Sequence, residues 1–240
     1  MASFHVQIKS AKPGVALNHL LYITRKSVIC PAKQQELVWM ESKNLPMWAP
    51  GPEEFFAAAD KHERANGAAY REYEVSLPKE LPLEKNVALT KKIAEKVLGP
   101  RPCQLVIHTT IGSISGEPHP HLHAMYSDRA CDGVERTEET YFSRYNAAEP
   151  EKGGAKKLSG GKTPSEIFGQ ARENRRKIAN CINDALEEHG IPQRVDPRSL
   201  KERGIKREAE KRLGVKGVKA LTPKGREAIL KARAASKRQT

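Results

Sequence analysis

The stretches CQLVIHTT (103–110) and HPHLHAMYS (119–127) decide how this chain folds. Both mix apolar residues with polar ones in a pattern typical of extended backbone, so each predicts a β-strand. The segment between them, IGSISGEP (111–118), is rich in Gly and Ser and predicts a loop. The two strands are therefore expected to lie side by side and antiparallel.

Further strands and helices are predicted around this pair from alternation, helical periodicity and the Pro and Gly residues at their ends. The predicted strands cover 3–9 and 69–77, and the predicted helices cover 15–26, 52–63, 84–98 and a long segment that Thr163 or Ser165 caps and that runs to His189. Because strands and helices do not alternate strictly, the pattern predicts an α+β fold built on one sheet.

Other segments carry no such pattern. We expect an irregular connection over 27–51, a hairpin over 130–137 with an Asp132-Gly133 turn, a Gly/Lys-rich linker or mobile loop over 150–163, and short helical pieces beyond Pro197.

The charge is concentrated at the C-terminal end. The 240 residues carry a net charge of +13, and residues 201–240 hold 14 Lys+Arg against 4 Asp+Glu, which is +10. The remaining 200 residues therefore carry only +3. We interpret 1–195 as a folded domain and 196–240 as a basic helical extension that contacts a polyanion, with a solvated, non-binding tail as the alternative.

Composition argues against a membrane or secreted protein. No stretch approaches 18 uncharged apolar residues, so no stable membrane insertion is expected. The N-terminus lacks the apolar core of a signal peptide, which predicts a cytoplasmic location. Four scattered cysteines form no CxxC pair and indicate reduced thiols rather than a zinc site: Cys30, Cys103, Cys131 and Cys181.

Three histidines are candidate metal ligands. His121 and His123 lie two residues apart on a predicted strand, so both side chains point to the same face. His108 on the preceding strand is expected to approach them. Three imidazoles with open coordination positions are typical of a catalytic metal site. We expect Mn²⁺ or Mg²⁺ first, with Zn²⁺ or Co²⁺ as alternatives; ordinary polar strand residues are the competing interpretation.

His119 lies on the same face by parity, but Pro120 beside it disturbs the strand, so His119 ranks below the other three. Glu72 and Glu74 share one face of the strand over 69–77. They are either a solvated edge or, if that strand lies beside the histidine strands, proton acceptors and partners of an imidazole N–H.

Tyr22 is the candidate nucleophile. On a helix over 15–26 it falls opposite the apolar stripe that contains Leu20. Arg25 and Lys26 lie near it, and basic neighbours favour a phenolate and attract a phosphate. An exposed surface tyrosine is the alternative.

With these residues in view, the chain resembles the plasmid mobilization relaxases of the MobA/MobL type, which belong to the HUH superfamily of DNA-nicking enzymes. His121-Leu122-His123 is the His–hydrophobic–His signature. The other matching stretches are LLYITR (20–25), KHERANGAAYREYEVSLP (61–78), LVIHTT (105–110), PHLHAMYSDR (120–129), DGVERTEETYFSRYN (132–146), EKGGAKK (151–157) and VDPRSLKERGI (195–205). The resemblance covers about residues 1–205.

The resemblance implies a central antiparallel sheet flanked by helices, the ferredoxin-like palm of HUH relaxases. It implies that Tyr22 attacks one strand at the plasmid transfer origin and forms a 5′-phosphotyrosyl link, which is later rejoined. His108, His121 and His123 would hold the divalent metal, and Glu72 and Glu74 would support proton transfer. Relaxosome accessory proteins and a coupling protein are the implied partners.

Single-stranded DNA would follow exposed basic groups. The candidate contacts are Arg25, Lys26, Arg71, Arg129 and Arg144, with Trp39 or Trp48 as stacking platforms. Two departures from the family pattern are the longer stretch between His108 and His121 and the additional His119. Three alternatives stay open: a rolling-circle replication initiator, a non-catalytic DNA-binding accessory protein, and a hydrolase without a covalent intermediate.

Overall fold

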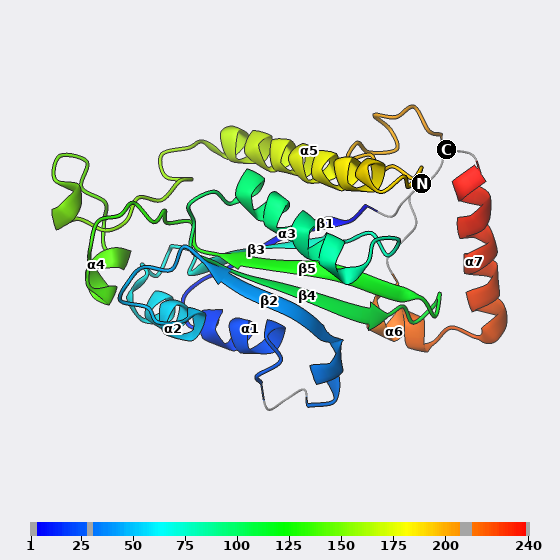
Figure 1. Cartoon of the computed structure of the whole chain (residues 1–240), viewed down its shortest axis with the longest axis horizontal. Coiled ribbons are helices and arrows are strands. Elements are labelled where there is room, and N and C mark those ends of the chain that lie inside the picture. The colour runs from blue at the N-terminus through cyan, green and yellow to red at the C-terminus, as the bar shows by residue number, and fades with distance from the viewer. Residues whose placement is uncertain (1–3, 28–30, 207–212, 239–240) are drawn as a thin grey trace.

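The structure, a computed structural model, describes residues 4–27, 31–206 and 213–238, so the predicted thiol of Cys30 lies outside it. Figure 1 shows the helices and strands in their layers. The strands are β1 (Val6–Ala11), β2 (Leu37–Lys43), β3 (Tyr70–Ser76), β4 (Cys103–Ile111) and β5 (Pro118–Tyr126). The helices are α1 (Ala16–Ile23), η1 (Pro31–Glu36), α2 (Pro52–His62), α3 (Leu83–Val97), α4 (Glu138–Phe142), η2 (Pro150–Lys152), α5 (Pro164–Glu188), α6 (Gly214–Lys219) and α7 (Pro223–Arg238).

In the part of the chain that the structure describes, five strands form one sheet in the order β1-β3-β5-β4-β2, with every neighbouring pair antiparallel. Helices α3 and α5 cover one face, and α1 and α2 cover the other (Figure 1). The predicted α+β fold with a central antiparallel sheet flanked by helices is therefore confirmed. No helix among the described residues has both the length and the apolar character needed to cross a membrane.

Alternation along β3 explains why both faces of the sheet are covered. Tyr73 and Val75 point into the core beneath α3 and α5. Tyr70 points to the opposite face and joins the core beneath α1 and α2. Glu72 lies on this second face and is fully buried, at 0 % exposure. A fully buried carboxylate needs partners of its own, and this face of the sheet carries the candidate site.

Helix α1 is anchored at its N-terminus by a carboxylate from α2. The Asp60 side chain accepts hydrogen bonds from the backbone N–H groups of four consecutive residues, Gly14, Val15, Ala16 and Leu17, at 2.7–3.1 Å. These are the N–H groups that a helix cannot satisfy by itself, and the negative charge also suits the positive end of the helix dipole.

Replacing Asp60 with alanine is expected to destabilise the protein by about 1–2 kcal/mol, the cost of losing a helix cap. Urea unfolding followed by circular dichroism measures this loss. Asp60→Asn retains one acceptor oxygen and is expected to lose less. Equal stability of Asp60→Ala and wild type would show that the cap contributes nothing.

Three of the predictions made from the sequence about secondary structure are wrong. Residues 27–51 are not one irregular connection, because β2 pairs with β4 along the edge of the sheet. Residues 130–137 do not form a hairpin; they run as irregular backbone into α4. The tail beyond Pro197 contains more than short pieces, since α7 has 16 residues. By contrast, Thr163 caps α5 as predicted, with Glu166 completing a capping box.

Candidate metal and nucleophile site

Strand pairing brings the three candidate histidines together. In the β4–β5 register His108 lies opposite His121 and Val106 lies opposite His123. The three imidazole rings have centroids 4.9–5.5 Å apart. One ring nitrogen of each lies within 4.8 Å of the others, so these nitrogens can bind one metal ion.

The remaining nitrogen of each imidazole already has a partner. His108 Nε2 donates to the Ile23 carbonyl at 2.6 Å, and His121 Nδ1 donates to the His119 carbonyl at 3.1 Å. His123 Nδ1 donates to Glu72 Oε1. A carbonyl or carboxylate can only accept, so the proton sits on these nitrogens. The opposite nitrogens of His121 and His123 keep a lone pair for a metal. That of His108, Nδ1, accepts a hydrogen bond from Arg25 Nη2 at 3.2 Å, which a bound metal would replace.

Burial favours the neutral form of two of these imidazoles, His108 and His121. Burial, with the nearby His123 and Arg25, lowers the pKa of His108 to about 3. Burial also lowers the pKa of His121, although its bond to the His119 carbonyl opposes this. Neutral histidine is the form that binds metal, so the donor set fits a divalent cation with open positions.

Glu72 bridges two histidines from different elements. Its Oε1 accepts from His123, and its Oε2 lies 2.6 Å from His19 Nε2 on α1. Burial raises the pKa of Glu72, but the hydrogen bonds and charges of His123 and His19 outweigh burial and hold the pKa far below its usual value. Glu72 is therefore a carboxylate in the folded protein, and it orients the imidazole of His123.

Glu74 has a different environment at the edge of the same face. Its carboxylate accepts from Lys9 Nζ at 2.5 Å. Burial raises the pKa of Glu74, while Lys9 and His123 lower it to a net value below normal. Glu72, Glu74 and His123 also form a second group whose ligand atoms lie within 4.8 Å, but Lys9 already neutralises Glu74 there.

Tyr22 lies at the last turn of α1 with 41 % of its surface exposed. Two contacts connect this turn to the histidines. The carbonyl of the next residue, Ile23, accepts from His108, and Arg25 Nη2 lies 3.2 Å from His108 Nδ1. The Arg25 guanidinium also lies 5.2 Å from the centre of the Tyr22 ring. The last turn of α1, which carries Tyr22, thus lies against His108.

Arg25 has an unusual backbone for its residue type. Its φ of +57° is left-handed, which glycine usually supplies after a helix, and it costs a residue with a Cβ about 1–3 kcal/mol. This conformation turns the side chain inward, where Nη2 contacts Glu36 at 2.5 Å as well as His108. The sequence placed Arg25 on an exposed DNA track, whereas the structure buries it in the wall of the site.

The other predicted DNA contacts divide into surface and interior groups. Lys26 is exposed and pairs with Glu53, Arg144 is exposed, and Arg71 is half-buried. Arg129 is only 2 % exposed, so the expectation that it contacts DNA is corrected. Its guanidinium instead holds parts of the chain together inside the protein.

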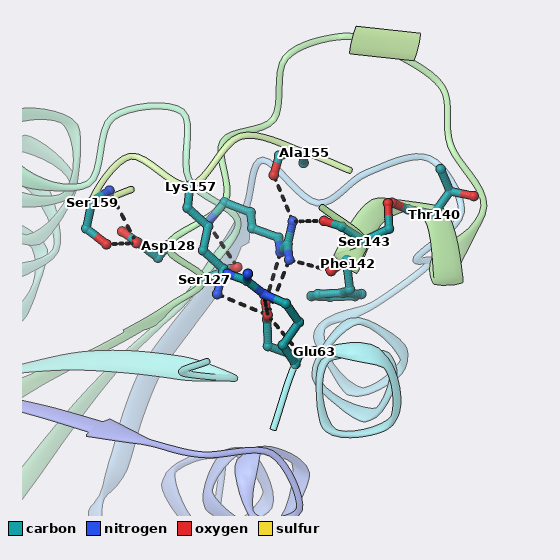
Figure 2. Close-up of polar contacts among 11 residues, drawn as sticks. Glu63, Ser127, Asp128, Thr140, Phe142, Ser143, Ala155, Lys157 and Ser159 are labelled. Carbon is teal, nitrogen blue, oxygen red and sulfur yellow. Dashed lines mark hydrogen bonds and ion pairs between the residues drawn. The ribbon is translucent and has the colours of Figure 1, made fainter. Parts of the chain in front are cut away.

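All five N–H groups of Arg129 have acceptors. Nε and Nη2 donate to the two carboxylate oxygens of Glu63 at 2.9 and 3.3 Å. The remaining donors reach the carbonyls of Ser143, Ala155 and Phe142. Figure 2 shows Glu63 and the carbonyl-bearing residues Phe142, Ser143 and Ala155 around this guanidinium. Lys157 Nζ also lies 3.0 Å from Glu63 Oε1. Residues 142–143 and 155 therefore meet at the buried ion pair of Glu63 and Arg129.

This network also corrects the prediction of a linker over 150–163. Gly153, Gly154 and Ala155 are buried. A Cβ added at Gly154 would lie 2.1 Å from the Ser143 carbonyl oxygen, so only glycine permits this close approach. Residues 153–155 of the Gly/Lys-rich segment are thus packed beside Arg129, whereas residues 160–163 are exposed.

The tryptophans do not offer free stacking platforms. Trp48 packs on Phe55 at 5.7 Å between ring centroids and joins the core beneath α2. Trp39 packs against the opposite core, with Lys91 Nζ 5.7 Å from its ring centre.

Comparison with known proteins places these residues in a family. The sequence model of the MobA/MobL family matches residues 23–222. The chain belongs to the MobA/MobL family. Tyr22 lies just before the matched region, and all three candidate histidines lie within it.

Two curated relatives are similar to this MobA/MobL chain. A 43 kDa relaxation protein of Salmonella typhimurium is 39 % identical over 210 residues, which cover 87 % of this chain and 57 % of the relative. Mobilization protein A of Escherichia coli is 39 % identical over 174 residues, covering 72 % of this chain and 23 % of the relative. The chain thus spans about half or less of the length of these relatives.

A solved structure supports the fold. It is described as "Molecular Basis of Vancomycin Resistance Transfer in Staphylococcus aureus", and it matches with a TM-score of 0.58 and 21 % identity over 82 % of this chain and 100 % of that chain. At this identity the likeness establishes the shared fold.

Sequence reasoning named the three histidines, Glu72 and Tyr22 but did not assign a role to His19. The sequence indicates His19 only weakly, by its position one helical turn before Tyr22. Only the packing of α1 across β3 reveals that His19 reaches Glu72.

Proposed function

We propose that this chain is a plasmid mobilization relaxase that nicks one DNA strand at a transfer origin through Tyr22. The observation that carries the proposal is the convergence of three metal-competent imidazoles with an exposed tyrosine, whose helix end hydrogen-bonds to one of them. Family membership and relatives named for relaxation and mobilization support it.

The chemistry is a transesterification. The Tyr22 hydroxyl oxygen forms a bond to phosphorus, the bond from phosphorus to the 3′ oxygen breaks, and the phenolic proton ends on the 3′-hydroxyl. The 5′-phosphotyrosyl link conserves the phosphodiester for later rejoining. His108, His121 and His123 would hold a divalent ion, with Mn²⁺ or Mg²⁺ preferred, and when bound it would act as a Lewis acid that offsets negative charge on the phosphate oxygens.

The chain's own residues prepare this step. Glu72 fixes the ring of His123 by accepting its Nδ1 proton, and the Ile23 carbonyl does the same for His108. Arg25 stands beside Tyr22, with its guanidinium paired to Glu36, and we propose that an arriving phosphate would compete with Glu36 for it. We propose that Lys26, Arg71, Arg144 and the basic residues of 196–240 bind the flanking single strand, and that the protein works in the cytoplasm with relaxosome accessory proteins and a coupling protein.

A covalent DNA adduct tests this proposal. A single-stranded oligonucleotide that carries candidate origin sequence, labelled on the 3′ side of the nick, is incubated with the protein and Mn²⁺ and run on a denaturing protein gel. We expect a labelled protein band with wild type and at least ~10³-fold less with Tyr22→Phe, which removes only the nucleophilic oxygen.

Other outcomes overturn the proposal in distinct ways. Cleavage without a labelled protein band identifies a hydrolase. DNA binding without cleavage across a panel of origin sequences that relatives nick, under the same conditions, identifies an accessory protein. Equal adduct from Tyr22→Phe places the nucleophile elsewhere.

A further inference from the structure

His19 occupies a place between the nucleophile and the metal ligands. It precedes Tyr22 by one helical turn, so both side chains lie on the same side of α1. The His19 ring stacks on Tyr70 from β3, with centroids 4.8 Å apart and planes 11° apart. The Tyr22 ring lies 6.4 Å away at 26°. The imidazole therefore stacks on Tyr70, and the Tyr22 ring lies nearby.

The polar edge of the His19 ring is held by a hydrogen bond. Its Nε2 lies 2.6 Å from Glu72 Oε2, and the other oxygen of that buried carboxylate accepts from His123 Nδ1. Lys9 Nζ is the next cation near Oε2, at 3.9 Å, and it is committed to Glu74. Within the described residues, His19 is thus the close donor that holds this side of Glu72.

We propose that His19 is a positioning residue that couples the nucleophile's helix to the metal ligand His123 through Glu72. The donor on Nε2 sets the orientation of the carboxylate, and the carboxylate sets the ring of His123. The same contact ties the middle of α1 to β3, between its anchors at Asp60 and at His108. We call the hydrogen-bonded chain His19–Glu72–His123 the bridge. The effect of the bridge on Tyr22 rests on the proposed function, whereas its effect on the His123 ring does not.

Two amide variants of His19 separate the effect of the N–H donor to Glu72 from the effect of losing the imidazole ring. His19→Gln places an N–H donor near the position of Nε2, whereas His19→Asn is shorter and does not reach Glu72. Both lose the ring equally. Isothermal titration of the DNA-free protein with Mn²⁺ is expected to show His19→Gln within about threefold of wild-type affinity and His19→Asn about tenfold weaker, the usual effect of removing an outer partner of a metal ligand.

A third variant covers the case in which losing the ring unfolds the protein. His19→Phe keeps a flat ring on Tyr70 but has no donor, so it is expected to match His19→Asn in Mn²⁺ affinity. His62→Asn on α2 is the matched control, because His62 pairs with the half-exposed Glu138 far from this bridge along the chain, and it is expected to bind Mn²⁺ like wild type.

The adduct assay gives the second measurement. At saturating DNA, the rate of adduct formation by His19→Asn is expected to fall about tenfold, with the Kd for DNA unchanged, because His19 orients groups and binds no phosphate. Equal Mn²⁺ affinity for His19→Gln, His19→Asn and wild type would overturn the bridge. So would equal weakening of both amide variants together with wild-type affinity for His19→Phe, which would show that only packing matters.

The two proposals fail separately. If wild type forms no adduct but His19→Asn still weakens Mn²⁺ binding, the relaxase proposal fails and the bridge stands. If wild type forms the adduct and His19→Asn equals it in both assays, the bridge fails and the relaxase proposal stands.

Discussion

Replacing His121 with alanine is expected to abolish metal-dependent DNA cleavage while single-stranded DNA binding stays within about threefold of wild type. His121 contributes one of three imidazole nitrogens that lie within 4.8 Å of one another. Removal of an outer partner alone costs about 10–100-fold in metal affinity, so removal of a ligand costs at least that much. In the proposed function DNA binding rests on the basic surface residues, which this change leaves intact.

Two measurements check this expectation. Mn²⁺ titration of the DNA-free protein reports metal affinity, and the adduct gel reports cleavage. Salt-dependent binding of a labelled oligonucleotide, followed by fluorescence anisotropy, reports the DNA surface. His121 is partly exposed and its Nδ1 bonds only to a backbone carbonyl, so the alanine variant is expected to fold.

His119 provides the matched control. It lies on the same strand two residues away, but it is exposed, and its ring packs over Gly112 at the start of the loop. His119→Ala leaves the backbone carbonyl that His121 uses, so we expect wild-type metal affinity and cleavage. Retained cleavage by His121→Ala, or loss of cleavage by His119→Ala, would contradict the assignment of ligands.

The sequence predicted that the three histidines lie together, as the structure has them, because strand alternation is a strong local rule. His121 and His123 had to share a face, and the short connection to His108 made antiparallel pairing the simplest arrangement. Tyr22 was predicted as the nucleophile for a similar reason, since it departs from the apolar stripe of its own helix, and this assignment stays a prediction. These inferences need only the geometry of one element or of two adjacent ones.

The errors arose where long-range contacts decide the outcome. Arg129 looks like a surface cation in the sequence, but a buried Glu63 from α2 and three distant carbonyls surround it. Gly154 looks like part of a linker, because nothing local indicates that another segment passes 2.1 Å from its missing Cβ. Strand β2 was missed because it follows a Pro- and Lys-containing stretch and gains its place by pairing with β4.

Replacing Arg129 with methionine is expected to destabilise the protein by about 3–5 kcal/mol, the cost of leaving a buried charge without its partner. Glu63 would keep Lys157, but the carbonyls of Phe142, Ser143 and Ala155 would each lose a donor. A domain is stable by only about 5–15 kcal/mol, so this one side chain accounts for a large part of the margin. Urea unfolding monitored by circular dichroism measures the loss.

Arg64→Met is the control for this change. It removes the same charge from a neighbour of Glu63, but Arg64 is exposed and its Nε lies 4.0 Å from the carboxylate. A surface pair of this kind contributes about 0–1 kcal/mol. Arg129→Lys is expected to resemble the methionine variant, because an ammonium group cannot reach the five acceptor atoms in the plane of a guanidinium.

The difference between wild type and Arg129→Met is also expected to depend on pH. Burial raises the pKa of Glu63, but Arg129 and Lys157 outweigh it and hold that pKa below its usual value. A carboxylate with a lowered pKa in the folded state adds stability above its unfolded pKa of about 4.3 and loses it as pH falls through the folded value. The stability gap should therefore be widest above pH ~5 and narrow on acidification below pH ~4. A gap that stays constant from pH ~7 to ~3.5 would show that the ion pair does not produce it, and that the lost carbonyl contacts account for the whole effect.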